Sequence, residues 1–306
     1  MALLDDTAPA PRVVAHQHIP LVASLLALGS GAVWSFGAIT ARLADGADAF
    51  QYLVWRSVAI LAVIEVVARI RRRPTVTPQA FRSGPLMLLA CGCLLLASIA
   101  FVYAVKNTSP ANAAFLASIT PLVAVVLARF TLGEQLTVVT IVAVAIAFVG
   151  LLVTVAGDVG GGDMKGNVAA VMSSVGFAGY AVCVRSDVRR DWSPVMPGYA
   201  LMMIVLCTAI TLAGGRALVP PGEDIALAAI HGGVFIVVGT TLFNVASRQI
   251  PAVPMAVFAQ TEMLFVPIWA LLVLGEEPST QSLVGGAIIF AAVVGKALVD
   301  ARNRPA

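Results

Sequence analysis

Ionisable side chains inside long apolar stretches are the residues of this 306-residue chain whose chemistry is easiest to specify. Glu262 lies near the middle of the apolar stretch from Ala252 to Leu274, two residues after Gln260. A charge at the centre of a membrane costs about 2.5–3.5 kcal/mol on insertion scales, so it normally faces a cavity or a partner. The Glu262 carboxylate therefore accepts an ammonium group, carries a proton, or hydrogen-bonds a neighbouring helix for packing.

Arg56 is a second charge inside an apolar stretch, seven residues after Ala49. Its planar guanidinium suits a carboxylate ligand. A side chain that reaches back to the membrane surface, or one that binds a helix end, explains this position as well. We predict that Glu262 and Arg56, supported by Gln260, contact the charged backbone groups of a zwitterionic ligand.

Other polar and aromatic side chains in the apolar stretches complete the predicted binding set. His231 either titrates or bonds a neighbouring helix. Asn112 and Asn244 each need a partner in apolar surroundings, so they line a cavity or join helices. Bulky ligands need flat walls, and four aromatic residues are positioned to supply them: Trp34, Trp55, Tyr103 and Tyr180. Packing is the alternative for the two tryptophans, and an interfacial position is the alternative for Tyr103.

Prolines inside the apolar stretches mark the places where helices bend. Pro121 and Pro267 each remove one helical hydrogen bond, which would cost about 3 kcal/mol in a straight helix interior. We predict kinks at both positions and a part for them in gating.

The sequence offers no basis for an enzyme, a metal site or a cofactor. Two of its three histidines lie in the N-terminal tail, and it contains neither a nucleophile elbow nor a zinc-protease motif. The four cysteines all fall in apolar stretches and are expected to be unpaired packing residues. The glycine-rich loop 157–166 lacks the Lys-Ser/Thr ending of a phosphate-binding loop, so we predict that it is a linker.

The elements that position these residues are transmembrane helices. Hydrophobic residues make up 59% of the chain and charged residues 11%, whereas soluble domains contain about 25% charged residues. Cutting the sequence at its charged and Pro/Gly clusters leaves ten apolar stretches, each long enough to cross a core of about 30 Å as a helix. They run over residues 20–43, 49–69, 85–106, 109–130, 136–157, 166–186, 196–214, 225–247, 252–274 and 280–299. The predicted fold class is an all-α integral membrane protein.

The positive charges fall mostly on one side of the predicted membrane. Fourteen lie on the side of the N-terminus: Arg12, Arg69, Arg71, Arg72, Arg73, Arg82, Arg129, Arg185, Arg189, Arg190, Arg248, Lys296, Arg302 and Arg304. Four lie on the other side: Arg42, Lys106, Lys165 and Arg216. This bias predicts cytoplasmic N- and C-termini. It also explains the net charge of +3 through membrane insertion, so no nucleic-acid partner is implied.

An internal repeat relates the two parts of the chain. The tripeptide Leu-Gly-Glu occurs at 132–134 and again at 274–276, 142 residues later. Five predicted spans separate the two copies, and an odd number of spans inverts the second copy in the membrane. Inverted repeats are the architecture by which one chain presents similar gates to both faces, so we predict alternating access around a central cavity. Duplication that merely built a stable bundle is the alternative.

These motifs resemble a known repeat. Residues 116–122 (Leu-Ala-Ser-Ile-Thr-Pro-Leu), followed by Leu-Gly-Glu at 132–134, resemble the EamA repeat of the drug/metabolite transporter superfamily. The second copy carries Leu-Gly-Glu at 274–276 and a Gly-Gly pair at 285–286, with Met263 where the first copy has Pro121. Within the superfamily the chain is most similar to the YddG-type bacterial amino acid exporters.

The resemblance implies an organisation and a function. Two five-helix repeats, 20–157 and 166–300, are expected to be joined by a linker, 158–165, and flanked by cytoplasmic tails, 1–19 and 301–306. The expected function is export of aromatic and other neutral amino acids, or related small metabolites, across the bacterial inner membrane. A channel-like facilitator and an exporter of other drugs or metabolites are the alternatives. The expected partners are the small-molecule substrate, the lipid bilayer and possible second copies in a homodimer.

Overall fold

The computed structural model describes residues 21–131, 133, 137–156, 164–187, 189–247 and 261–302, and every regular element among them is a helix. The first half of the chain forms α1 (Leu21–Leu43), α2 (Ala49–Ile70), α3 (Thr77–Arg82), α4 (Pro85–Asn107), α5 (Pro110–Ala117), α6 (Thr120–Thr131) and α7 (Val138–Ala156). The second half forms α8 (Met164–Ser186), α9 (Val195–Ala213), α10 (Gly222–Ile230), η1 (His231–Ile236), α11 (Val237–Ser247), α13 (Thr261–Trp269), η2 (Ala270–Leu274) and α14 (Thr280–Arg302). The two η segments are π-helical.

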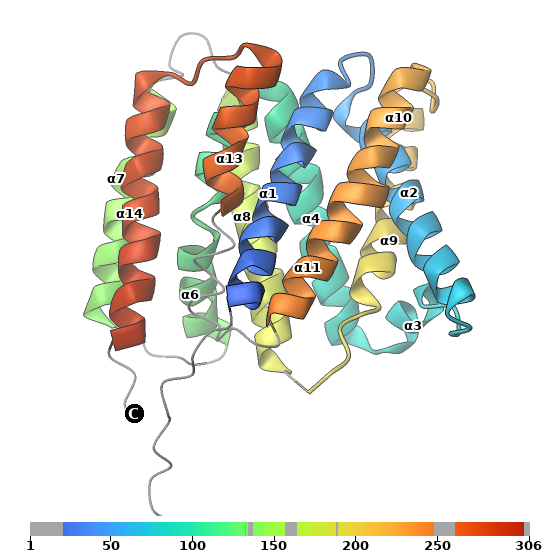
Figure 1. The fold of residues 1–306 in the computed structure, drawn as a ribbon, viewed down its shortest axis with the longest axis horizontal. Coiled ribbons are helices and arrows are strands. Elements are labelled where there is room, and N and C mark those ends of the chain that lie inside the picture. The colour runs from blue at the N-terminus through green and yellow to red at the C-terminus, as the bar shows by residue number, and fades with distance from the viewer. Residues whose placement is uncertain are drawn as a thin grey trace, which may run out of the picture.

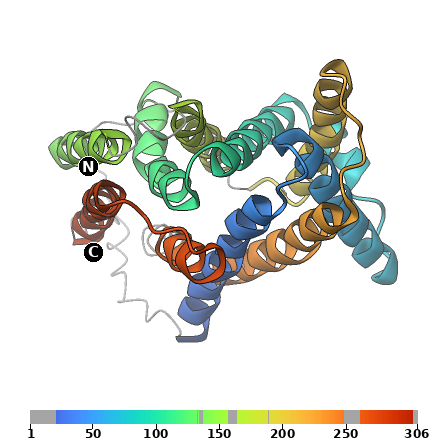
Figure 2. The same ribbon diagram turned by 90° about the horizontal axis from the view of Figure 1, so that it is seen from above.

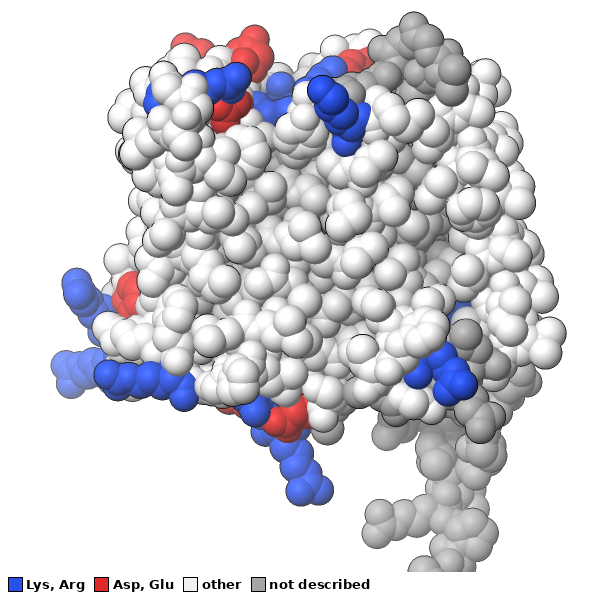
Figure 3. All heavy atoms as spheres, turned by 180° about the vertical axis from the view of Figure 1, so that it is seen from behind, with Lys and Arg blue, Asp and Glu red and all other residues white. Residues whose placement is uncertain are grey.

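The helices have the length and composition of membrane spans. Within the described residues, seven are long and apolar enough to cross a membrane, counting directly successive segments as one. The other three of the ten predicted stretches correspond to α2 and to shorter apolar helices at Thr261–Leu274 and Thr280–Lys296. Figure 3 shows Lys, Arg, Asp and Glu gathered toward the two ends of the molecule, with an uncharged band between them. The protein is therefore a multi-pass membrane protein.

The helices stand side by side in two rows that are flanked by two helix pairs (Figures 1 and 2). In one row α8 packs against α4 and α6, and in the other α1 packs against α11 and α13. The flanking pairs are α2 with α9 and α7 with α14. The shift of 142 residues matches α1 with α8, α2 with α9, α4 with α11, α6 with α13 and α7 with α14. Exchanging the two members of each match leaves this pattern of neighbours unchanged.

Matched helices of the two halves run in opposite directions. We call the end of the bundle that carries the α1–α2 connection the Arg42 end, which lies at the top of Figure 1, and the opposite end the Arg71 end. Helix α1 finishes at the Arg42 end, whereas α8 begins there, where Thr108 bonds Asn167 at 3.1 Å. Helix α2 begins there, with Asp48 as its N-cap, whereas α9 finishes there, shortly before Arg216, whose guanidinium pairs with Asp48.

The fourth predicted span, 109–130, is interrupted instead of continuous. Helix α5 ends at Ala117 and α6 begins at Thr120, so the interruption is at Ser118 and Ile119, and Pro121 is the second residue of α6. Because Pro121 has no N–H, the carbonyl of Ala117 loses its helical donor. The Thr120 hydroxyl takes its place and donates to the Ala117 oxygen at 2.7 Å. Thr120 therefore stabilises the break that Pro121 causes.

Candidate functional site

A cluster of bonds at the Arg42 end joins the two halves of the chain. The Arg42 Nε donates to Glu276 Oε1 at 2.8 Å, linking α1 to the turn after η2. Arg42 Nη1 also lies 3.4 Å from the carbonyl oxygen of Lys106 at the end of α4. Lys106 Nζ in turn donates to the carbonyls of Ala47, at 2.8 Å, and Ala44. We call Arg42, Lys106 and Glu276 the Arg42 cluster; its bonds hold α1, α4 and the η2–α14 turn together.

A pocket with charges of both signs opens beside the Arg42 cluster. Its volume is about 720 Å³, and α1, α2, α4 and α9 all contribute to its lining. Three cations, Arg42, Lys106 and Arg216, and two carboxylates, Asp45 and Asp48, line it. Arg216 Nη1 and Asp48 Oδ2 form an ion pair at 2.5 Å across it. A pocket of this kind can hold a molecule that carries both charges.

His231 belongs to a buried chain of hydrogen bonds between three helices. Its side chain, 3% exposed, lies 2.8 Å from the Tyr52 hydroxyl through Nδ1. The Tyr52 hydroxyl donates to Thr40 Oγ1 at 3.1 Å, and Thr40 donates to the carbonyl of Gly37 at 3.0 Å. The Tyr52 hydroxyl donates its one proton to Thr40, so it can only accept a hydrogen bond from His231. We therefore assign a proton to His231 Nδ1. Gly37 leaves room for the imidazole, because a Cβ there would collide with it.

Arg56 is buried among α2, η1 and α9. Its side chain is 3% exposed, and its Nε and Nη2 have no hydrogen-bond partner within the described part of the chain. The backbone at Arg56 lies so close to Gly232 that η1 must carry a glycine there. Asp224, 5% exposed, also has one carboxylate oxygen without a partner among the described residues. Buried groups in this state are sites where a further ligand or water is expected.

Glu262 lies in the first turn of α13 and is half-buried. The next residue, Met263, packs with Ala111 and Phe115 of α5. The shift of 142 residues that aligns the two repeats places Glu262 on Thr120, the residue at the break in the fourth span. Glu262 thus lies at the second-half position that matches the first residue of α6.

The structure does not bring Arg56 and Glu262 together. Arg56 belongs to α2, which packs against α9, α10 and η1, whereas Glu262 belongs to α13, which packs against α1 and α5. Gln260 lies outside the described residues, and so does the side chain of Asn244 on α11. The prediction that these residues share one ligand stays a prediction.

The predicted aromatic residues occupy separate places. Trp34 packs on Gly239 and Phe243 of α11, its ring 5.4 Å from that of Phe243. The Trp55 Nε1 donates to the Leu218 carbonyl in the α9–α10 connection at 3.1 Å. Tyr180 on α8 is half-buried, with its ring 5.9 Å from that of its helix neighbour Phe177.

Three further residues of the predicted set are Asn112 in α5, Tyr103 in α4 and Pro267 in α13. Asn112 is buried in the first turn of α5, where its backbone N–H donates to Ser109 Oγ at 3.1 Å. Tyr103 lines both the charged pocket and a second hollow between α4 and α8. Pro267 lies inside α13, three residues before the π-helical turn η2 begins.

The predicted site includes neither the Arg42 cluster nor a column of stacked aromatic rings. Phe36 stacks on Phe235 at 5.4 Å and on Trp269 at 4.7 Å, and Trp269 stacks on Phe265 at 5.8 Å. The Trp269 Nε1 donates to Ser35 Oγ at 2.9 Å. One signal was available for the Arg42 cluster, because Glu276 lies in a repeated motif at the same predicted membrane edge as Arg42.

These features define a multi-pass α-helical membrane protein built from two similar halves, with charged groups that join them at one end. The chain belongs to the EamA-like transporter family, whose model matches residues 21–156 and 164–296. It is therefore a transporter and not an enzyme.

A solved protein titled only "Crystal structure of protein" has the same fold. It is 21% identical to this chain, with a TM-score of 0.63 over 92% of this chain and 99% of that one. No curated protein sequence matches the chain.

Proposed function

We propose that this protein is a secondary transporter that exports amino acids from the cytoplasm by alternating access. The observation that carries the proposal is the opposed direction of matched helices, α1 against α8 and α2 against α9, in a member of a transporter family. Two halves related in this way form an inverted repeat of ten spans and can exchange conformations. The excess of arginine at the Arg71 end supports a cytoplasmic position for that end and for both termini in a bacterial inner membrane.

The Arg42 cluster supplies a closure for the outward-facing end. Its ion pair and backbone bonds tie α1, α4 and the η2–α14 turn in the conformation described here. Arg42 and Glu276 are about one third exposed, so each bond is weak and can break when substrate binds. In this proposal the Arg42 end opens for release when the Arg42–Glu276 pair separates.

The break in the fourth span and the first turn of α13 supply the proposed substrate site. Transporters commonly bind substrate where broken helices meet near the middle of the membrane. We propose that Glu262, in the first turn of α13, accepts the substrate ammonium group; its neighbour Met263 packs against α5. The N-terminus of α6 begins at the break in the fourth span and offers its positive dipole end to the substrate carboxylate. The substrate class, neutral amino acids with aromatic ones included, is that of the YddG-type exporters that the sequence resembles.

Counterflow in proteoliposomes tests the proposal. Vesicles loaded with one unlabelled amino acid should accumulate the labelled form, with saturation and competition, when a panel of amino acids and other small metabolites is screened with and without a pH gradient. Glu262→Gln should lower the rate at least about tenfold, since a charge-assisted bond of about 1.5–3 kcal/mol is lost. Glu277→Gln, at an exposed position in the η2–α14 turn, is the matched control and should transport normally.

Two results would reject parts of the proposal. Flux that never saturates would indicate a channel-like facilitator instead of a carrier. Saturable counterflow of other metabolites, with none for any amino acid, would keep the carrier and reject the substrate class.

A further inference from the structure

Arg56 is a cation that the described helices enclose without a matching negative charge. It lies seven residues after the start of α2 and is 3% exposed, so its side chain does not reach back to the membrane surface. Within the described residues nothing accepts a hydrogen bond from its Nε or Nη2, so these atoms bind no helix end either. Of the three alternatives that the sequence leaves open for Arg56, burial therefore favours a bound anion.

The described helices packed against α2 bring no carboxylate to Arg56. Helix α9 contains no charged residue, and η1 contributes only His231. The carboxylates of α10, Glu223 and Asp224, lie in its first turn at the Arg42 end, and neither forms an ion pair with Arg56 in the described part of the chain. The Arg56 charge interacts instead with side chains that carry no negative charge: Tyr52, Tyr199, Cys207 and His231.

A guanidinium in such surroundings needs an anion. Arginine does not lose its proton in proteins, so it cannot become neutral as a buried lysine or carboxylic acid can. A buried charge is stable only when it is paired or coordinated. The Nε and Nη2 atoms carry N–H groups on the same edge of the planar guanidinium, and this edge can donate two hydrogen bonds to one anion. Ser57, the next residue and fully buried, also has a hydroxyl without a partner among the described residues.

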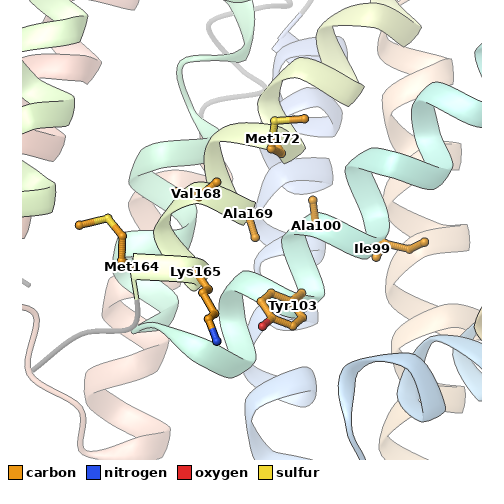
Figure 4. Close-up of a pocket in the computed structure, with 8 residues that line it drawn as sticks. All are labelled: Ile99, Ala100, Tyr103, Met164, Lys165, Val168, Ala169 and Met172. Carbon is orange, nitrogen blue, oxygen red and sulfur yellow. The ribbon is translucent and has the colours of Figure 1, made fainter. Parts of the chain in front are cut away.

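The space beside Arg56 limits the anion to a small one. Gly232 of η1 contacts the Arg56 backbone so closely that a Cβ would not fit, and α9 packs against α2 as well. The hollow between α4 and α8 (Figure 4) is lined by residues of those two helices alone, and Arg56 does not line the charged pocket either. This position is too closed for an amino acid, whereas a monatomic ion requires little more room than a water molecule.

We propose that Arg56 binds one chloride ion between α2, η1 and α9, through the N–H groups of Nε and Nη2. The ion neutralises the guanidinium where α2 of the first half meets η1 and α9 of the second half. It therefore stabilises the contact between the two halves. The proposal does not depend on which substrate the protein carries.

Thermal unfolding of the detergent-solubilised full chain tests the proposal. Replacing gluconate by chloride at constant ionic strength should raise the wild-type unfolding midpoint by about 2–4 °C and then saturate, because the ion binds only the folded protein. Arg56→Gln should remove this rise. Arg82→Gln, which removes an exposed cation of α3, is the matched control and should keep it.

The line width of the chloride NMR signal measures the bound ion directly. Chloride that exchanges with the wild-type protein should show extra broadening, which Arg56→Gln should lack and Arg82→Gln should retain. If Arg56→Gln does not fold, Arg56→Lys makes the same test. This variant keeps the charge but loses the edge with two donors, so it should bind chloride about tenfold more weakly.

Three outcomes would overturn the proposal. Equal midpoints in chloride and gluconate, without line broadening, would show that water satisfies Arg56. A chloride effect of full size in Arg56→Gln would place the ion elsewhere. Displacement of chloride by neutral amino acids at equal concentration would show that Arg56 binds the carboxylate of a substrate instead.

Discussion

The Tyr52 hydroxyl joins α1, α2 and η1 through two hydrogen bonds, to Thr40 at 3.1 Å and to His231 at 2.8 Å. All three side chains are buried, so water cannot replace a lost partner easily. The π-helical segment η1 begins at His231, and π-helical turns are frequent at functional positions. Through these hydrogen bonds His231 joins neighbouring helices. The sequence leaves two alternatives for His231, titration and bonding to a neighbouring helix, and the observed bonds correspond to the second.

Tyr52→Phe should therefore destabilise the protein without removing a charge. The variant leaves His231 Nδ1 without its partner in a buried site and removes the hydrogen bond that Thr40 Oγ1 accepts, a loss of about 1–3 kcal/mol. We expect a lower thermal unfolding midpoint in detergent. Tyr180→Phe is the control, because Tyr180 is only half-buried, and its midpoint should stay close to the wild-type value. Equal midpoints for wild type and Tyr52→Phe would show that the chain contributes nothing.

Some site residues follow from the sequence, and others do not. Glu262, Arg56 and His231 can be identified from the sequence because an ionisable group inside a membrane span is costly and normally has a partner or faces a cavity. Arg42 and Glu276 lie 234 positions apart, and their pairing depends on how two halves close on each other. Arg56 and Glu262 illustrate the same limit, since composition places both in membrane spans but only packing decides which helices each one faces.

Helices α7 and α14 meet at two glycines. A Cβ added to Gly285 would lie 2.5 Å from the Gly150 oxygen and 2.6 Å from the Thr154 nitrogen, which are backbone atoms that cannot turn aside. A Cβ added to Gly150 would lie 2.8 Å from the Gly285 oxygen. Small residues that let backbones approach are the usual means by which membrane helices associate.

Gly285→Leu should separate this helix pair. Overpacking of this kind costs about 1–3 kcal/mol, and backbone neighbours put this site at the upper end. We expect a lower unfolding midpoint and a smaller folded fraction in size-exclusion chromatography. Gly295→Leu on the same helix is the matched control, because nothing lies within 4 Å of a Cβ at that position. If both variants lose the same stability, the glycine contact is not the cause.

In the proposed mechanism the fourth span flexes at the break between α5 and α6. Pro121→Ala restores the N–H that can bond the Ala117 carbonyl, now satisfied by Thr120. The fourth span should then become a continuous helix, gaining up to about 3 kcal/mol. We expect a raised unfolding midpoint and slower counterflow, since the span can no longer flex at Ser118 and Ile119. A raised midpoint with an unchanged rate would show that the break is not used in transport.

Hydrophobic patterning predicts where helices lie better than how they are interrupted. The stretch 109–130 reads as one span, and proline chemistry predicts a bend near Pro121, but the exact break depends on the hydroxyl bonds of Ser118 and Thr120. The π-helical segments η1 and η2 leave no mark on apolar periodicity. Their location depends on close packing, as the contact of Gly232 with the backbone of α2 illustrates.

The whole molecule consists of two similar segments whose matched helices run in opposite directions. Composition predicts the membrane, and the repeated Leu-Gly-Glu with five spans between its copies predicts the inversion. Repetition cannot predict which end is closed, because an inverted repeat is compatible with closure at either face. In the proposed mechanism the bonds of the Arg42 cluster close the Arg42 end in the conformation described here.

The central claim is that transport requires the Arg42 end to open. Cysteines at Arg42 and Glu276, in a background with the four native cysteines replaced by alanine, can be joined by a short reducible thiol cross-linker in proteoliposomes. Counterflow of the amino acid identified by the panel should stop on cross-linking and return on reduction, while each single-cysteine variant treated alike should remain active. Full counterflow in the cross-linked protein would contradict alternating access through this end.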